Sequence, residues 1–154
     1  LDNKIKSRVW KRNVQGDVKK VALEFVEFLK CQKKITPILL ISGGETTVKI
    51  KGSGKGGRNQ ELALYISYYM KKQLPFVKYS FLSAGTDGRD GPTDAAGAII
   101  DNTVIEKINE KKIDLVKELK NNNSYDVLKK TNSLILIEGT STNVADIQLF
   151  AIKG

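Results

Sequence analysis

Hydrophobic residues recur at helical spacing between residues 17 and 32, which predicts an amphipathic helix there. Asp17 is a suitable N-cap, and the apolar residues after it lie three or four positions apart. The same spacing predicts a second helix over 59–72. Shorter helices are predicted near 102–111, 114–121 and 124–130.

Short apolar runs between these helices predict strands. The first is Ile38-Leu39-Leu40-Ile41, which follows Pro37 and is expected to end at Ser42-Gly43-Gly44. An alternating, β-rich stretch from Thr46 to Lys51 predicts a second strand, hairpinned or closely connected to the first. The remaining strands are predicted at 79–84, 95–100, 134–137 and 147–152.

This alternation of strands and helices indicates the α/β class. We expect a mixed, mostly parallel sheet flanked by helices on both faces, with functional loops at the strand ends. No internal repeat or long linker divides the sequence, so residues 1–154 are expected to form a single compact domain. Its 154 residues are enough to bury a real core.

The residue inventory narrows the chemistry. Histidine is absent and Cys31 is the single cysteine, which excludes Ser-His-Asp and Cys-His catalysis, an internal disulfide and His- or Cys-based zinc sites. Phosphoryl transfer tolerates such a residue set, because it depends mostly on positioning and charge stabilisation. No apolar run approaches the roughly 18 residues that span a bilayer, so we expect no membrane segment. A cytoplasmic location is expected.

The net charge of +9 has two interpretations, a phosphate-rich partner or a lysine-rich solvated surface. The lysines are spread along the chain, and no aromatic residues alternate with them as a nucleic-acid platform would require. We therefore expect no nucleic-acid partner. Whether the chain forms a homo-oligomer is left open.

Three polar loops follow apolar strands and hold most of the unusual residues. In the first, 42–47, Gly43 and Gly44 followed by Glu45 are typical either of close backbone approach to a ligand or of a tight turn. The third, 83–97, carries Asp87, Asp90 and Asp94, which could hold Mg²⁺ or position a hydroxyl, or could simply form turns.

The second loop, 51–61, leads from four glycines into the N-terminus of a predicted helix. Free backbone amides and the helix dipole favour anions there, and Arg58 can grip a phosphate or carboxylate at two points. The loop is not a Walker A motif, because Arg58-Asn59 follows Gly57. A G-x-G-x-x-G match is present, but no acidic residue stands about 20 positions later to hold a ribose.

Long motifs in these loops resemble the C-terminal MOFRL domain of the two-domain glycerate kinases. The resemblance covers the chain from about Gly16 to its end in one collinear order. It rests on Leu40-Ile41-Ser42-Gly43-Gly44-Glu45-Thr46-Thr47-Val48, on Gly54-Lys55-Gly56-Gly57-Arg58-Asn59-Gln60-Glu61, on Leu82-Ser83-Ala84-Gly85-Thr86-Asp87-Gly88, and on the run from Asp90 to Ala98. Ser124-Tyr125 and Thr142-Asn143-Val144 match weaker family patterns. The run Glu138-Gly139-Thr140-Ser141-Thr142-Asn143 departs from the family, whose members carry a Gly-Pro-Thr-Gly-Thr-Asn-like sequence there.

The resemblance implies transfer of the ATP γ-phosphoryl group to D-glycerate, giving 2-phosphoglycerate, with Mg²⁺ as a cofactor. It implies an active site shared with a larger N-terminal domain that has no counterpart here, and a start at Leu1 fits a fragment. Arg58, Asp87 and Asp90 are the expected catalytic residues, with no metal ligand assigned. The expected substrate- and phosphate-binding residues are Gly43, Gly44, Glu45, Lys55, Gly56, Gly57, Asn59, Thr86, Thr93 and Asp94.

Two other functions stay open. Some relatives carry the label hydroxypyruvate reductase, and glycerate differs from hydroxypyruvate by one hydride. The weak G-x-G-x-x-G match and the absence of a proton-relay histidine count against this reading. The other alternative is a non-catalytic module that binds anions.

Overall fold

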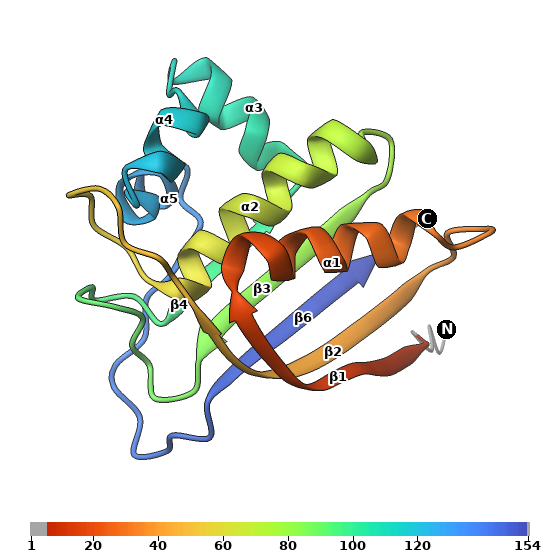
Figure 1. Ribbon diagram of the computed structural model, residues 1–154, viewed down its shortest axis with the longest axis horizontal. Coiled ribbons are helices and arrows are strands. Elements are labelled where there is room, and N and C mark those ends of the chain that lie inside the picture. Colours follow the sequence, from red (N-terminus) through yellow and green to blue (C-terminus); the bar gives the residue numbers. More distant parts are fainter. Residues whose placement is uncertain (1–5, 154) are drawn as a thin grey trace.

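The computed structural model describes residues 6–153, which form one sheet and five helices (Figure 1). In chain order the elements are β1 Ser7–Asp17, α1 Val18–Lys30, β2 Ile38–Thr47, α2 Arg58–Gln73, β3 Tyr79–Gly85, β4 Gly97–Asp101, α3 Thr103–Glu110, α4 Leu115–Lys120, α5 Ser124–Lys130, β5 Leu134–Ile135 and β6 Asp146–Ile152. The five predicted helices are thereby confirmed, with α1 capped by the Asp17 carboxylate as expected.

The sheet has the strand order β1-β2-β6-β3-β4-β5. It is mixed, as predicted, but the expectation that it is mostly parallel was wrong. Within residues 6–153 only β1 and β2 pair in parallel, and the other four neighbouring pairs are antiparallel. The reason is the position of β6, which enters between β2 and β3 and runs opposite to both.

The N-terminal strand β1 was not predicted, because its sequence is mostly polar. It lies at the edge of the sheet, and Val14 is its one buried residue. An edge strand with so little apolar burial carries no alternating signal. The structure therefore begins one strand earlier than the sequence indicated.

The expected break in β2 at Ser42-Gly43-Gly44 was also wrong. The strand continues to Thr47, and residues 48–51 form no second strand. Gly44 is needed because β1 comes very close: a Cβ there would lie 2.3 Å from Val14 N, and its φ is +148°. Gly44 thus permits close packing of two strands rather than a turn.

Helices α1 and α2 pack side by side over one face of the sheet (Figure 1). Phe25 of α1 packs in the core against Phe81 of β3 and Phe150 of β6. On the opposite face, Val9, Ile99 and Ile147 are exposed by 52%, 49% and 37%, so the expectation of helices on both faces was wrong. No helix within residues 6–153 combines the length and apolar character needed to cross a membrane.

Candidate functional site

The predicted functional residues gather at the end of the sheet where β2 and β3 end and β6 begins. At this end Asp146, the first residue of β6, lies between Gly44 of β2 and Gly85 of β3 in the strand register. The N-terminus of α2 reaches the same place, because Arg58 is its first residue and contacts Asp146. Residues more than 80 positions apart in the chain are thus neighbours.

Arg58 is held by a buried carboxylate. Its Nε donates to Asp146 Oδ2 at 2.7 Å and its Nη2 donates to Asp146 Oδ1 at 2.8 Å. The Asp146 side chain is 0% exposed, whereas that of Arg58 is 31% exposed. The hydrogen bond to Asp146 raises the pKa of Arg58, so its positive charge is secure. Glu45 Oε1 lies 3.4 Å from Nη2 on the solvent side, with 62% of its side chain exposed.

Asp146 was missed in the sequence. It begins an apolar strand, Asp146-Ile147-Gln148-Leu149-Phe150, where an acidic residue at a buried position has no local partner. Such an isolated acid at a strand start was the available signal, since a buried charge needs a pairing group elsewhere in the chain.

Asp90 occupies the anion position that the α2 N-terminus was predicted to offer. Its carboxylate accepts from the backbone N–H of Asn59 at 3.1 Å and of Gln60 at 2.9 Å, and from Asn59 Nδ2 at 3.3 Å. Asp90 is 1% exposed in this domain. Burial raises the pKa of Asp90, and these hydrogen bonds oppose the rise. The protein therefore caps α2 with a carboxylate of its own.

Gly57 is the position where α2 and Asp90 meet. A Cβ at Gly57 would lie 2.3 Å from Asp90 Cγ, so no larger residue fits without displacing the carboxylate.

Asn59 and Thr93 belong to the same buried network. Asn59 accepts a hydrogen bond from Ser83 Oγ, and Thr93 Oγ1 accepts one from Gln60 Nε2 at 3.0 Å. Their polar groups bind other parts of the protein in this structure.

The glycine-rich loop is clamped by three consecutive asparagines, Asn121, Asn122 and Asn123. Asn122 Oδ1 accepts from the N–H groups of Lys51 and Gly52, at 2.7 and 3.1 Å. Asn121 Oδ1 and Asn123 Oδ1 accept from the N–H groups of residues 53 and 55, and the Asn121 backbone carbonyl accepts from that of residue 54. This clamp was not predicted, although three adjacent asparagines at a helix end are a recognisable turn signal.

The clamp and Asp90 use most of the amides that the sequence suggested were free. Among the described residues, the N–H groups of Gly56, Gly57 and Arg58 are the three in this loop that have no hydrogen-bond partner. A Cβ at Gly56 would lie 2.1 Å from Ser124 Oγ, so this glycine too is required by packing. The anion-binding potential of the loop is therefore confined to three amides beside the Arg58 side chain.

Lys55 and Asp94 meet at Tyr125, a residue to which the sequence assigned no role. Tyr125 Oη donates to Asp94 Oδ1 at 2.7 Å, and Lys55 Nζ lies 4.4 Å from the centroid of the tyrosine ring. The Tyr125 hydrogen bond, followed by the nearby Lys55 and Lys129, lowers the pKa of Asp94. Asp94 is accordingly ionised at neutral pH and holds the tyrosine hydroxyl in place.

Thr86 and Asp87 connect the loop after β3 to the loop before β6. Thr86 Oγ1 donates to Ala145 O at 2.7 Å and accepts from Val144 N at 2.9 Å, while Thr140 N donates to Asp87 O at 3.0 Å. Asp87 Oδ1 accepts from Arg89 N at 3.0 Å, and its side chain is only partly buried. The loop at 139–143 therefore borders the site, despite its departure from the family sequence.

The three aspartates do not form a magnesium site. Asp90 caps α2, Asp94 binds Tyr125 and Asp87 braces its own loop. Within residues 6–153 no group of three or more acidic or cysteine side chains is placed to hold a metal ion. These residues do not fit the ion as ligands, so no step of a reaction is assigned to it here.

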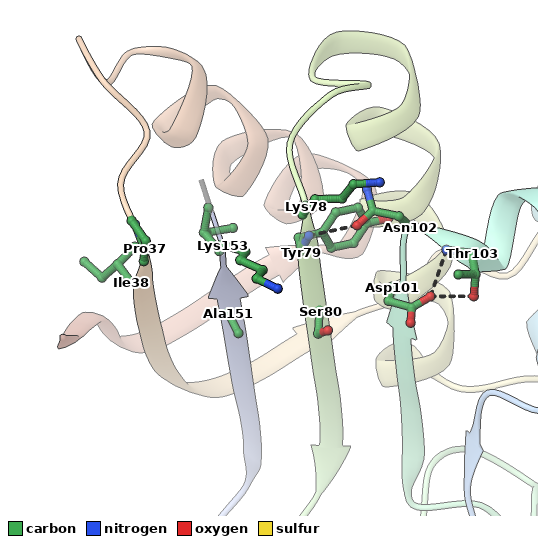
Figure 2. A pocket seen from close by; sticks show the side chains of 11 residues that line it. Pro37, Ile38, Lys78, Tyr79, Ser80, Asp101, Asn102, Thr103, Ala151 and Lys153 are labelled. Carbon is green, nitrogen blue, oxygen red and sulfur yellow. Dashed lines mark hydrogen bonds between the residues drawn. The ribbon is translucent and has the colours of Figure 1, made fainter. Parts of the chain in front are cut away.

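The cavities of the molecule only partly coincide with this cluster. A cavity of about 320 Å³ is lined by Arg89, Thr93 and Asp94, next to Gly139. A larger one of about 510 Å³ lies at the opposite end of the sheet, where β2 begins and β6 ends (Figure 2). Two of its polar side chains are engaged locally: Asn102 Oδ1 accepts from Tyr79 N at 2.9 Å, and Asp101 accepts from Thr103. None of the predicted site residues lines this second cavity.

The sequence profile of the MOFRL family matches residues 38–146, which is more than half of the chain. The chain belongs to the MOFRL family. Glycerate 2-kinase from Pyrococcus horikoshii is 47% identical over 112 residues, which cover 72% of this chain and 24% of that protein. D-glycerate 2-kinase from Thermotoga maritima is 47% identical over 111 residues, covering 72% and 26%.

Solved structures of MOFRL relatives share the fold. The crystal structure of a glycerate kinase from Thermotoga maritima superposes with a TM-score of 0.88 at 35% identity, covering 98% of this chain and 37% of that one. A structure from Pyrococcus horikoshii gives a TM-score of 0.87 at 36% identity, covering 98% and 35%. The chain thus spans about a quarter to a third of the length of these relatives.

Proposed function

We propose that this chain is the C-terminal domain of a glycerate kinase, which transfers the γ-phosphoryl group of ATP to D-glycerate and gives 2-phosphoglycerate. The observation that carries the proposal is the match to proteins named glycerate kinase, over nearly the whole chain and with the fold retained. The rest of the active site would be supplied by a larger N-terminal domain, which is consistent with the greater length of the relatives. The proposal includes a cytoplasmic location, because ATP is available there as the phosphoryl donor.

The geometry supports a phosphoryl-transfer role for the α2 N-terminus. Three amides that have no hydrogen-bond partner among residues 6–153, those of Gly56, Gly57 and Arg58, adjoin a guanidinium that is held in one orientation. Such a group of fixed donors stabilises charge that develops on a transferring phosphoryl group or holds a carboxylate. Lys55 adds a second cation beside the loop.

Arg58 is the residue that we propose contacts the phosphoryl group or the carboxylate of glycerate. Asp146 occupies its Nε and one N–H of Nη2, so the outer edge with Nη1 faces the ligand. We propose that Asp87, partly exposed in the loop after β3, accepts a hydrogen bond from a glycerate hydroxyl. Glu45, on the solvent side of Arg58, would be displaced by an incoming anion, because its contact with Arg58 is long and exposed.

A coupled assay on the full-length protein tests this function and its product. ATP, Mg²⁺ and D-glycerate should release ADP, and added enolase should convert the product to phosphoenolpyruvate without a phosphoglycerate mutase, because enolase acts on 2-phosphoglycerate. A product that needs the mutase would be 3-phosphoglycerate, and it would refute phosphorylation of glycerate at the 2-hydroxyl. NADH oxidation with hydroxypyruvate, in the absence of ADP release, would favour the reductase instead.

A further inference from the structure

Asp146 is a buried charged group at the candidate site, and the sequence comparisons assign it no role. Its side chain is 0% exposed, and both carboxylate oxygens accept hydrogen bonds from Arg58. On either side in the sheet it faces a glycine, Gly44 in β2 and Gly85 in β3. No side chain of the neighbouring strands at this register thus competes for the carboxylate.

The two hydrogen bonds decide how the arginine is presented. An arginine side chain has several rotatable bonds, and at 31% exposure Arg58 could otherwise sample many orientations in solvent. Parallel N–H···O bonds to a fixed carboxylate leave the planar guanidinium a single orientation. Within the described residues its hydrogen bonds are confined to Nε and Nη2, which leaves the Nη1 edge free to bind a ligand.

Glu45 provides a built-in comparison. It also lies near Arg58 Nη2, but at 3.4 Å, and 62% of its side chain is exposed. An exposed partner at this distance is weakly held and screened by water. Of the two acids that form ion pairs with Arg58, one is therefore fixed and buried, and the other is free to move away when an anion arrives.

We propose that Asp146 is a positioning residue for phosphoryl transfer, which acts by holding the Arg58 guanidinium with its Nη1 edge toward the reacting group. This inference rests on the proposed kinase function of the site. Asp146 itself touches no ligand, because it lies behind Arg58 and is closed off from solvent. Its effect on the reaction must pass through the arginine.

A double-mutant cycle on the full-length protein tests this dependence. Asp146→Asn keeps the shape but replaces one acceptor by an NH₂ group that faces an arginine donor. We expect kcat to fall about 100-fold with little change in the KM for ATP, the cost of a misplaced group at a reacting centre. In an Arg58→Ala background the same Asp146→Asn change should alter kcat less than about threefold, because its route of action is gone.

Equal losses of kcat in the two backgrounds would overturn the proposal, and so would an unchanged kcat in Asp146→Asn. The matched control is Glu24→Gln, an acid-to-amide change in the exposed ion pair with Lys11, which should leave kcat as it is. If Asp146→Asn fails to fold, Asp146→Glu keeps the charge and shifts the carboxylate by one methylene. It should fold and still lower kcat about tenfold, and a wild-type kcat would refute the role.

A second readout separates this inference from the proposed function. Arginine-selective ¹⁵N labelling of the full-length protein should show a slowly exchanging Arg58 Nε–H resonance, assigned by its loss in Arg58→Lys. We expect the protection to disappear in Asp146→Asn or Asp146→Glu. A wild-type protein that releases no ADP would refute the kinase proposal while this resonance still decides whether Asp146 holds Arg58. Unchanged protection in these variants would refute the positioning role.

Discussion

Replacing Arg58 by alanine should destabilise the protein as well as slow its reaction. A loop arginine would be expected to matter little for folding, but the structure places Asp146 behind it with 0% of its side chain exposed. Arg58→Ala leaves that carboxylate without its two hydrogen bonds and without a counter-charge. Removing one partner of a buried ion pair costs about 3–5 kcal/mol.

The lower end of that range applies here. Arg58 is itself 31% exposed, so its removal opens a path for water to reach Asp146 and offset part of the loss. We therefore expect a loss of about 3 kcal/mol in the free energy of unfolding. For a domain of this size, that loss lowers the melting temperature by about 6–12 °C.

The double variant Arg58→Ala/Asp146→Asn separates the buried charge from all other effects. With the charge removed, most of the lost stability should return, to within about 1 kcal/mol of the wild type. Urea unfolding of wild type, both single variants and the double variant at pH 7 gives these four values. A melting temperature of Arg58→Ala within about 2 °C of the wild type would refute the reasoning.

Three further predictions concern other parts of the chain. Asn122→Ala removes the acceptor of two loop amides and the donor to buried Glu61. Urea unfolding should therefore show a loss of about 2–3 kcal/mol in the free energy of unfolding. An effect below about 0.5 kcal/mol would argue against the asparagine clamp. Burial raises the pKa of Glu61, so its contribution to stability is present at low pH and is lost as the pH rises through the folded-state pKa. Glu61→Gln should therefore melt at the wild-type temperature at pH 4 but above it at pH 7.5, and a constant difference would refute this assignment. The 154-residue chain without the rest of the longer protein should release no ADP above background with ATP and D-glycerate, and robust turnover would refute a shared active site.

The local sequence determined the helices and the general location of the candidate site. The apolar spacing from 17 to 32 and from 59 to 72 identified α1 and α2, because one buried helical face requires that period. The glycine-rich and aspartate-rich loops were correctly placed at strand or helix ends. Motifs of this length also identified the family from sequence alone.

Only the tertiary structure decided which groups in those loops are free. Asp90 and the three asparagines occupy most of the amides that the sequence presented as an anion site, and they come from segments 30 to 71 positions away. A sequence pattern shows that donors exist, but pairing depends on which loops the fold brings together. Likewise, Gly57 and Gly44 are required because Asp90 and Val14 lie too close to leave room for a side chain.

Long-range folding also decided the strand order of the sheet and the partner of Arg58. The alternation of β2, α2 and β3 correctly indicated two strands running in the same direction, but it could not reveal that β6 would enter between them. That insertion made the sheet largely antiparallel and brought Asp146 to Arg58, 88 positions away in the chain. Composition and periodicity act over a few residues, whereas strand order is decided by how the whole core is buried.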